Sequence, residues 1–121
     1  MPKITHFELP VEDVERSIKF YSAAFGWKFQ KWGEENYWMI STGSDDEPGI
    51  NGGLMKKMDP NQPPTNVMDV PNLDEAMAAV RAAGGEIVVD RMEVPTIGWL
   101  SYFKDPDGII IGMMELMPHG E

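Results

Sequence analysis

His6 and Glu8 are the first residues whose types and spacing could support chemistry. They lie two residues apart in the stretch Ile4–Leu9, which is predicted to be a short strand before the first helix. If this stretch is a strand, both side chains point to the same face of the sheet. An imidazole beside a carboxylate can act as a general base or bind a divalent cation. His6 could equally be a structural residue that is hydrogen-bonded to a neighbour, and both interpretations stay open.

A second group of residues could contact a small molecule. Strand alternation places Asn51, Gly53 and Met55 on one face of a predicted strand, and Gly112 and Met114 on one face of another. Asn51 could orient a ligand carbonyl or hold a turn, and the methionines could line an adaptable pocket or fill the core. The predicted ligand-binding set is Trp38, Asn51, Gly53, Met55, Thr65, Trp99, Tyr102, Gly112 and Met114.

The overall composition narrows the class of partner. The 121 residues include twenty Asp and Glu but only ten Lys and Arg, which gives a net charge of −10. No basic cluster offsets this charge, so we expect no binding to nucleic acid or to a membrane surface. The chain has no cysteine, which excludes disulfides and thiolate chemistry. We find no secretory signal and no apolar stretch near the ~20 residues of a membrane helix, and therefore expect a cytoplasmic protein.

The sequence repeats itself weakly with an offset of 59 residues. At this offset Gly26 corresponds to Gly85, and Gly53 to Gly112. We therefore predict a single domain of residues 1–121 that is built from two modules, with module one at 1–58, a linker at 59–62 and module two at 63–121. His119 lies near a polar chain end, where we expect no ordered structure.

Each module is predicted to have the order β-α-β-β-β. A short strand opens each module, and an amphipathic helix follows, with Asp13 and Asn72 as N-cap candidates. The three later strands are predicted at 27–32, 36–42 and 50–56 in module one, and at 86–94, 99–104 and 109–117 in module two. The turn Asp105–Gly108 separates the last two strands. The fold class is therefore α+β, and a single copy would leave one sheet face uncovered.

At this level the chain resembles the vicinal oxygen chelate superfamily, which contains glyoxalases, bleomycin-resistance proteins and extradiol dioxygenases, and in particular its small glyoxalase-like proteins. The residues that carry the resemblance are His6, Val14–Tyr21, Phe25–Trp27, Pro48–Leu54, Leu73–Ala76, Ala83–Gly85 and Asp105–Gly108. The resemblance implies two βαβββ modules whose curved mixed sheet encloses a cleft. It also implies a homodimer and, in the catalytic members, a divalent metal with one ligand from each opening and each closing strand.

The metal ligands that the family implies are mostly missing from this chain. His6 occupies the first opening-strand position, but the corresponding residue of module two is Thr65, and both closing-strand positions are glycine, at Gly53 and Gly112. Glu115 lies three residues past Gly112, so alternation turns it to the other face. His6 is thus the only candidate at a family ligand position, and one imidazole does not make a catalytic metal site. We predict no cofactor.

Three functions follow, in this order. The first is a small-molecule-binding protein with a degenerate metal site and an apolar cleft lined by aromatic and methionine side chains, in which His6 and Glu8 are the candidate catalytic or polar residues. The second is a metal-dependent glyoxalase-like lyase or isomerase, or a dioxygenase, which would need a divalent metal. The third is a non-catalytic interaction domain. Whether the protein is an enzyme stays open, as does the identity of its ligand.

Overall fold

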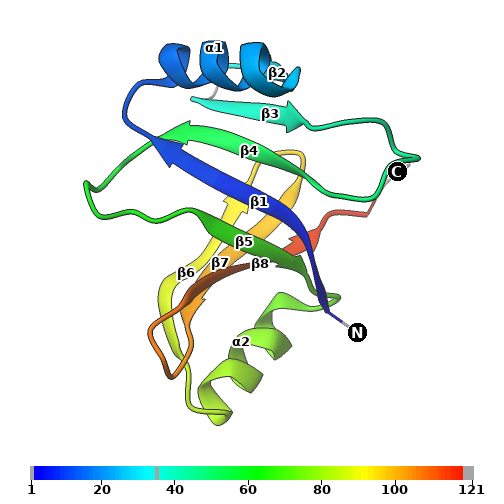
Figure 1. Ribbon diagram of the computed structural model, residues 1–121. Helices are drawn as coiled ribbons and strands as arrows, with labels where there is room; N and C mark the ends of the chain where they lie inside the picture. Colours follow the sequence, from blue (N-terminus) through cyan, green and yellow to red (C-terminus); the bar gives the residue numbers. More distant parts are fainter. Residues whose placement is uncertain (1, 35, 119–121) are drawn as a thin grey trace. The chain divides into compact units, whose positions relative to one another are not determined.

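The order of helices and strands follows the repeat in the sequence (Figure 1). The computed structural model describes residues 2–34 and 36–118, so His119 lies outside the described residues. Module one contains β1 (Lys3–Val11), α1 (Val14–Phe25), β2 (Lys28–Lys31), β3 (Tyr37–Ser41) and β4 (Asn51–Lys56). Module two contains β5 (Thr65–Asp69), α2 (Leu73–Ala82), β6 (Glu86–Val94), β7 (Gly98–Lys104) and β8 (Ile110–Leu116). The predicted order β-α-β-β-β and the α+β class are confirmed.

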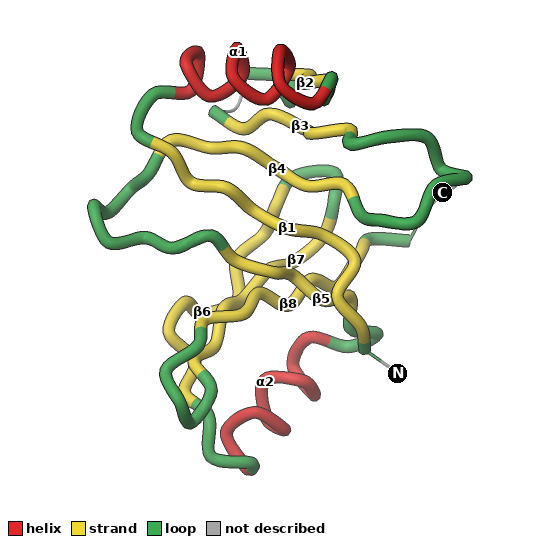
Figure 2. The backbone as a smooth tube through the Cα atoms, in the orientation of Figure 1, coloured by secondary structure: helices red, strands yellow, loops and turns green. Residues whose placement is uncertain are grey.

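Each module has a mixed sheet with the same connectivity (Figure 2). The strands of module one lie in the order β2-β3-β4-β1, and those of module two in the order β5-β8-β7-β6. The pairs β1–β4 and β5–β8 are parallel, whereas the hairpin pairs are antiparallel. By its contacts the chain divides into two units, one of which is His6–Pro64, and the other includes the described residues from Thr65 onward and those before His6.

Side-chain caps fix the first turn of both helices. Asp13 Oδ1 accepts a hydrogen bond of 3.0 Å from the backbone N–H of Arg16, and Asn72 Oδ1 accepts one of 2.9 Å from that of Glu75. The Asp13 and Asn72 caps predicted from the sequence are therefore confirmed. Gly26 ends α1 with a φ of 74°, a conformation that favours glycine. Neither described helix is long and apolar enough to cross a membrane.

The two helices are buried to different extents. In module two, a core cluster forms where α2 packs on its sheet, and it consists of Val70, Leu73, Met77 and Met113. In module one, Ile40 and Leu54 are buried in the sheet, but no residue of α1 is fully buried. There Tyr21 stacks on Trp27 with ring centroids 4.9 Å apart. Aromatic contact therefore replaces aliphatic burial on the helix side of module one.

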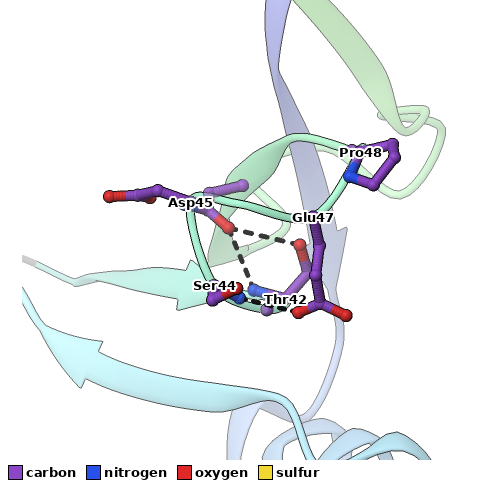
Figure 3. A pocket seen from close by; sticks show the side chains of 8 residues that line it. Thr42, Ser44, Asp45, Glu47 and Pro48 are labelled. Carbon is purple, nitrogen blue, oxygen red and sulfur yellow. Dashed lines mark hydrogen bonds between the residues drawn. The ribbon is translucent and has the colours of Figure 1, made fainter.

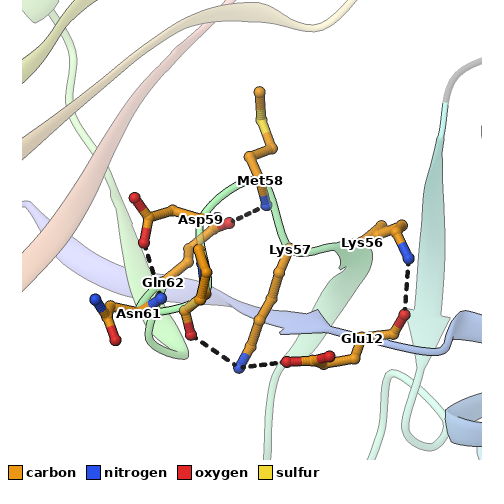
Figure 4. Close-up of polar contacts among 8 residues, drawn as sticks. Glu12, Lys56, Lys57, Met58, Asp59, Asn61 and Gln62 are labelled. Carbon is orange, nitrogen blue, oxygen red and sulfur yellow. Dashed lines mark hydrogen bonds and ion pairs between the residues drawn. The ribbon is translucent and has the colours of Figure 1, made fainter.

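Polar contacts fold the connection between the modules back onto module one (Figure 4). The backbone N–H of Lys57 donates to the carbonyl of Val11 at 2.8 Å, and its Nζ lies 4.0 Å from the Glu12 carboxylate. Within the connection, the N–H of Met58 donates to Oε1 of Gln62 at 2.9 Å. The segment is thus a structured turn that is attached to the end of β1.

Candidate functional site

The parallel pairing of β1 with β4 brings the candidate polar residues of module one to a single face. His6 is opposite Asn51, and Glu8 is opposite Gly53. Directly paired residues of neighbouring strands point to the same side of a sheet. The antiparallel pairing of β3 with β4 adds Tyr37, which is opposite Met55. This face, called the His6 face below, carries His6, Glu8, Tyr37, Met39, Asn51, Gly53 and Met55.

Tyr37 dominates the His6 face. Its hydroxyl lies 2.8 Å from Nε2 of His6 and forms a hydrogen bond with it. Its ring and hydroxyl also cover Gly53, because a Cβ built on Gly53 would overlap Oη and Cζ of Tyr37. The space that a side chain at position 53 would need is therefore filled by the phenol. In the first module, a tyrosine therefore closes the closing-strand position at which the resemblance implies a metal ligand.

The surroundings of Tyr37 keep its phenol neutral. Burial raises the pKa of Tyr37 above its ordinary value of 10.0, and the negative charge of Glu8 raises it further. Glu8 itself is buried, with 7% of its surface exposed. A phenol that keeps its proton donates to Nε2 of His6 when the imidazole proton is on Nδ1. The arrangement is a partly buried polar group of imidazole, phenol and carboxylate.

The corresponding face of module two is also closed by a tyrosine, but more loosely. Tyr102 pairs with Gly112 across β7 and β8, and Val67 pairs with Gly112 across β5 and β8. A Cβ on Gly112 would lie 3.1 Å from Cε2 of Tyr102 and 3.1 Å from Cγ2 of Val67. Such a Cβ would be in tight contact without overlapping either neighbour. Thr65 and Met114 lie on the same strands, with Thr65 buried and Met114 half-buried.

Two of the predicted aromatic residues, Trp38 and Trp99, lie on the sheet faces opposite those that carry Gly53 and Gly112. Trp38 pairs with the buried Leu54, and alternation places it on the face of β3 opposite Tyr37, where Nζ of Lys31 lies 5.7 Å from its ring centroid. Trp99 packs against the core cluster of α2, on the face of β7 opposite Tyr102. The structure therefore brings His6, Glu8, Gly53 and Met55 together in module one, and Tyr102 with Gly112 in module two. It places neither tryptophan with them.

Asn51 holds the connection between β3 and β4. Its Oδ1 accepts hydrogen bonds from the backbone N–H of Thr42 at 3.0 Å and from the Thr42 hydroxyl at 3.2 Å. The connection encloses a polar pocket of about 150 Å³ (Figure 3), lined by Thr42, Gly43, Ser44, Asp45, Glu47, Pro48, Gly49 and Asn51. Glu47 accepts from the N–H of Ser44 at 2.9 Å. Much of the hydrogen-bonding capacity of the groups that line this pocket is thus already satisfied within the turn.

The described part of the chain does not group the donor set for the metal that the resemblance implies. Within residues 2–34 and 36–118, no three His, Asp or Glu side chains are grouped as a metal site requires. Glu115 does turn to the opposite face, as its spacing predicts, since its Oε1 accepts a hydrogen bond of 2.8 Å from the N–H of Leu73 at the start of α2. His6 and Glu8 remain, and Tyr37 occupies the space beside them.

Tyr37 and Met39 are the residues of this face that the sequence analysis did not predict, and Tyr37 is the one that contacts His6. Tyr37 lies at the start of the predicted strand 36–42, next to Trp38, whose side chain belongs to the opposite face of that strand. The antiparallel pairing of that strand with 50–56 places Tyr37 and Met39 beside Met55 and Gly53, in a register that the sequence alone does not display. The available signal is a tyrosine on the same face as Gly53 and in a diagonal position to it across β3 and β4.

Comparisons with known proteins agree with the architecture. Residues 3–43 match the family described as bleomycin resistance protein-like N-terminal. A glyoxylase-like domain-containing protein of Didymella fabae is 30% identical over 112 residues, which cover 88% of each chain.

Solved structures show the same fold at low sequence identity. The methylmalonyl-CoA epimerase of Mycobacterium tuberculosis matches 95% of this chain and 88% of its own, with a TM-score of 0.69 and 16% identity. A hypothetical protein of Bacillus halodurans C-125 matches 99% of this chain and 98% of its own, with a TM-score of 0.70 and 11% identity. These similarities establish the fold.

Proposed function

Because this chain belongs to the glyoxalase/bleomycin-resistance group of the vicinal oxygen chelate superfamily, we propose that it is a metal-independent small-molecule-binding protein. In this proposal the His6 face supplies the polar contacts to the ligand. The observation that carries it is the hydrogen bond between Tyr37 and His6 over Gly53, in place of the ligands that a metal would need. Small-molecule sites combine a few placed polar groups with an apolar surround.

The chemistry of the His6 face indicates the kind of ligand. The neutral phenol of Tyr37 and the imidazole of His6 can each offer or accept a hydrogen bond. Glu8 adds a buried negative charge, and the whole chain has a net charge of −10. Both charges disfavour an anionic group on the ligand. Met55 lies beside Tyr37 on this face and adds an adaptable apolar contact. We therefore expect a neutral ligand with a carbonyl or hydroxyl oxygen and an apolar body.

The test is a binding screen with matched tyrosine variants. Native mass spectrometry of freshly purified protein looks for a co-purified molecule, and thermal shift assays test a set of neutral carbonyl compounds. For a compound that binds, Tyr37→Phe should raise Kd by about 2- to 12-fold, because the variant loses one hydrogen bond to the ligand. Tyr21→Phe, on α1 in the same module, should leave Kd unchanged. The proposal fails if nothing binds, or if the two variants behave alike.

The second candidate is the metal-dependent glyoxalase-like lyase or isomerase. The name of the Didymella fabae relative and the fold of the epimerases favour chemistry beside a carbonyl group. It ranks second because the described residues group no donor set for the metal. Stoichiometric zinc, nickel or manganese in the purified protein would reverse this order.

The predicted homodimer and the predicted cytoplasmic location belong to the proposal as well. Phe20 and Phe25 of α1 are 58% and 66% exposed, which is unusual for two large aromatic side chains so close together. Light scattering coupled to size-exclusion chromatography gives the subunit count. A mass equal to one chain at all concentrations would remove the dimer from the proposal.

A further inference from the structure

We infer that Tyr37 is the residue that keeps a divalent cation away from His6, and that position 53 is glycine because the phenol occupies its side-chain space. This inference rests on the metal independence assumed in the proposed function, but it concerns a different property of the same face. In this inference, the side chain of Tyr37 fills the space that a carboxylate ligand at position 53 would take. The site is then a metal position that one side chain has closed.

Two independent contacts of Tyr37 support this closure. The hydroxyl is hydrogen-bonded to Nε2 of His6 at a distance of 2.8 Å. A metal on this side of the ring would need this nitrogen as its ligand. The ring and hydroxyl overlap the position of any Cβ on residue 53. A larger residue at position 53 and the present position of Tyr37 therefore exclude one another.

The strand register shows what removal of the phenol would leave. His6 and Glu8 lie on one face of β1, and position 53 is directly opposite Glu8 on β4. Neighbouring strands of a sheet lie about 4.7–4.9 Å apart, so side chains at these two positions are close neighbours. The double variant Tyr37→Ala/Gly53→Glu would thus place one imidazole and two carboxylates on neighbouring positions. Three such donors are the protein ligands of a catalytic zinc site.

The experiment measures zinc binding by calorimetry in the wild type and in this double variant. The double variant should bind Zn²⁺ at least about tenfold more tightly than the wild type, which means a Kd at least about tenfold lower. Adding His6→Gln to the double variant should abolish the gain. Tyr37→Phe keeps the ring over Gly53 and should therefore gain less than the double variant.

A second measurement covers the case in which the double variant does not fold. The chain has two histidines, His6 and His119, whose ring resonances can be assigned by substitution. In Tyr37→Ala, zinc should shift the His6 ring resonances at concentrations that leave those of the wild type unchanged. Equal responses of His6 in the two proteins would overturn the inference.

The outcomes separate the inference from the proposed function. Stoichiometric zinc binding at His6 of the wild type would refute both the closure by Tyr37 and metal independence. If neither the wild type nor the folded double variant binds zinc, only the inference fails. A failed ligand screen affects only the proposed function.

Discussion

Gly53 and Gly112 occupy corresponding positions of the two modules, yet their tyrosines close them in different ways. Tyr37 comes from the end of a neighbouring strand, overlaps the missing side chain and is fixed by His6. Tyr102 is the direct cross-strand partner of Gly112, and its ring leaves room for tight contact with a Cβ. A repeat in sequence thus reproduces the backbone of the site, while the side chains of the adjacent strand decide how it is closed.

One added methyl group is expected to have a large effect on stability at Gly53 and a small effect at Gly112. Gly53→Ala should destabilise the protein by about 3 kcal/mol, because the new Cβ displaces Tyr37 and breaks its hydrogen bond with His6. Gly112→Ala should change stability by less than about 1 kcal/mol, since small shifts of its neighbours suffice. Urea unfolding of both variants measures the difference.

A double-mutant cycle with Tyr37 sharpens this comparison. In a Tyr37→Ala background, Gly53→Ala should cost within about 1 kcal/mol, because the side chain that it displaces is gone. If the full cost persists there, the constraint on Gly53 comes from the backbone and not from the phenol.

The helices of the two modules also differ, in how deeply equivalent residues are buried. Ile18 on α1 and Met77 on α2 are 59 residues apart and hold equivalent positions. Met77 is 4% exposed, whereas Ile18 is only partly buried. Met77→Ala should cost about 2–4 kcal/mol and Ile18→Ala about 1 kcal/mol, as measured by denaturant unfolding. Equal costs that depend on protein concentration would show that a second molecule covers α1 in solution.

The sequence was sufficient to predict the elements and their order. Alternation, the Asp13 and Asn72 caps and the turn Asp105–Gly108 are local signals, and the structure agrees with each of them. The repeat supplied the correspondence of Gly53 with Gly112. These features depend on residues close in the chain or on a simple offset.

The closure of the site could not be predicted in the same way. Two glycines suggested an open, apolar floor, but Tyr37 covers Gly53 from a strand whose register the sequence does not display. Trp38 was the more prominent candidate, although it lies on the opposite face of the same strand. Tyr37 and Trp38 are adjacent in the sequence, and adjacent side chains of a strand point to opposite faces of the sheet. A shift of one residue therefore decides which of the two lies on the His6 face.

Alkaline titration tests the polar group of module one against the other tyrosines. The pKa of Tyr37 is raised by burial and by Glu8, so its folded-state value exceeds its unfolded value of about 10. Above about pH 10 the unfolded chain loses this proton while the native protein retains it, and stability therefore falls as the pH rises. Tyr37→Phe should make this fall shallower.

Phenolate absorbance reports the same group directly. Tyr37 of the native protein should resist ionisation until the protein unfolds, and this resistant fraction of the absorbance change should disappear in Tyr37→Phe. The matched substitution Tyr21→Phe should leave it in place. An unchanged resistant fraction in Tyr37→Phe would assign it to another tyrosine, such as Tyr102.

The smallest effect concerns the two helix N-termini, where residues 59 positions apart have opposite charges. Glu115 accepts a hydrogen bond from the N–H of Leu73 at the start of α2, whereas Lys56 donates to the carbonyl of Glu12 just before α1. A carboxylate is favourable at a helix N-terminus and a cation is not. Glu115→Gln should therefore cost about 0.5–1 kcal/mol in low salt, and Lys56→Gln should be neutral or slightly stabilising.

Salt separates the charge of Glu115 from its hydrogen bond. In high salt the cost of Glu115→Gln should shrink, because screening removes the interaction with the helix dipole while the glutamine oxygen still accepts from Leu73. Glu115→Ala should remain destabilising at all salt concentrations, since it removes the acceptor as well. If both variants lose the same stability at low and high salt, the acceptor alone matters, and the charge difference between the two modules has no energetic consequence at this position.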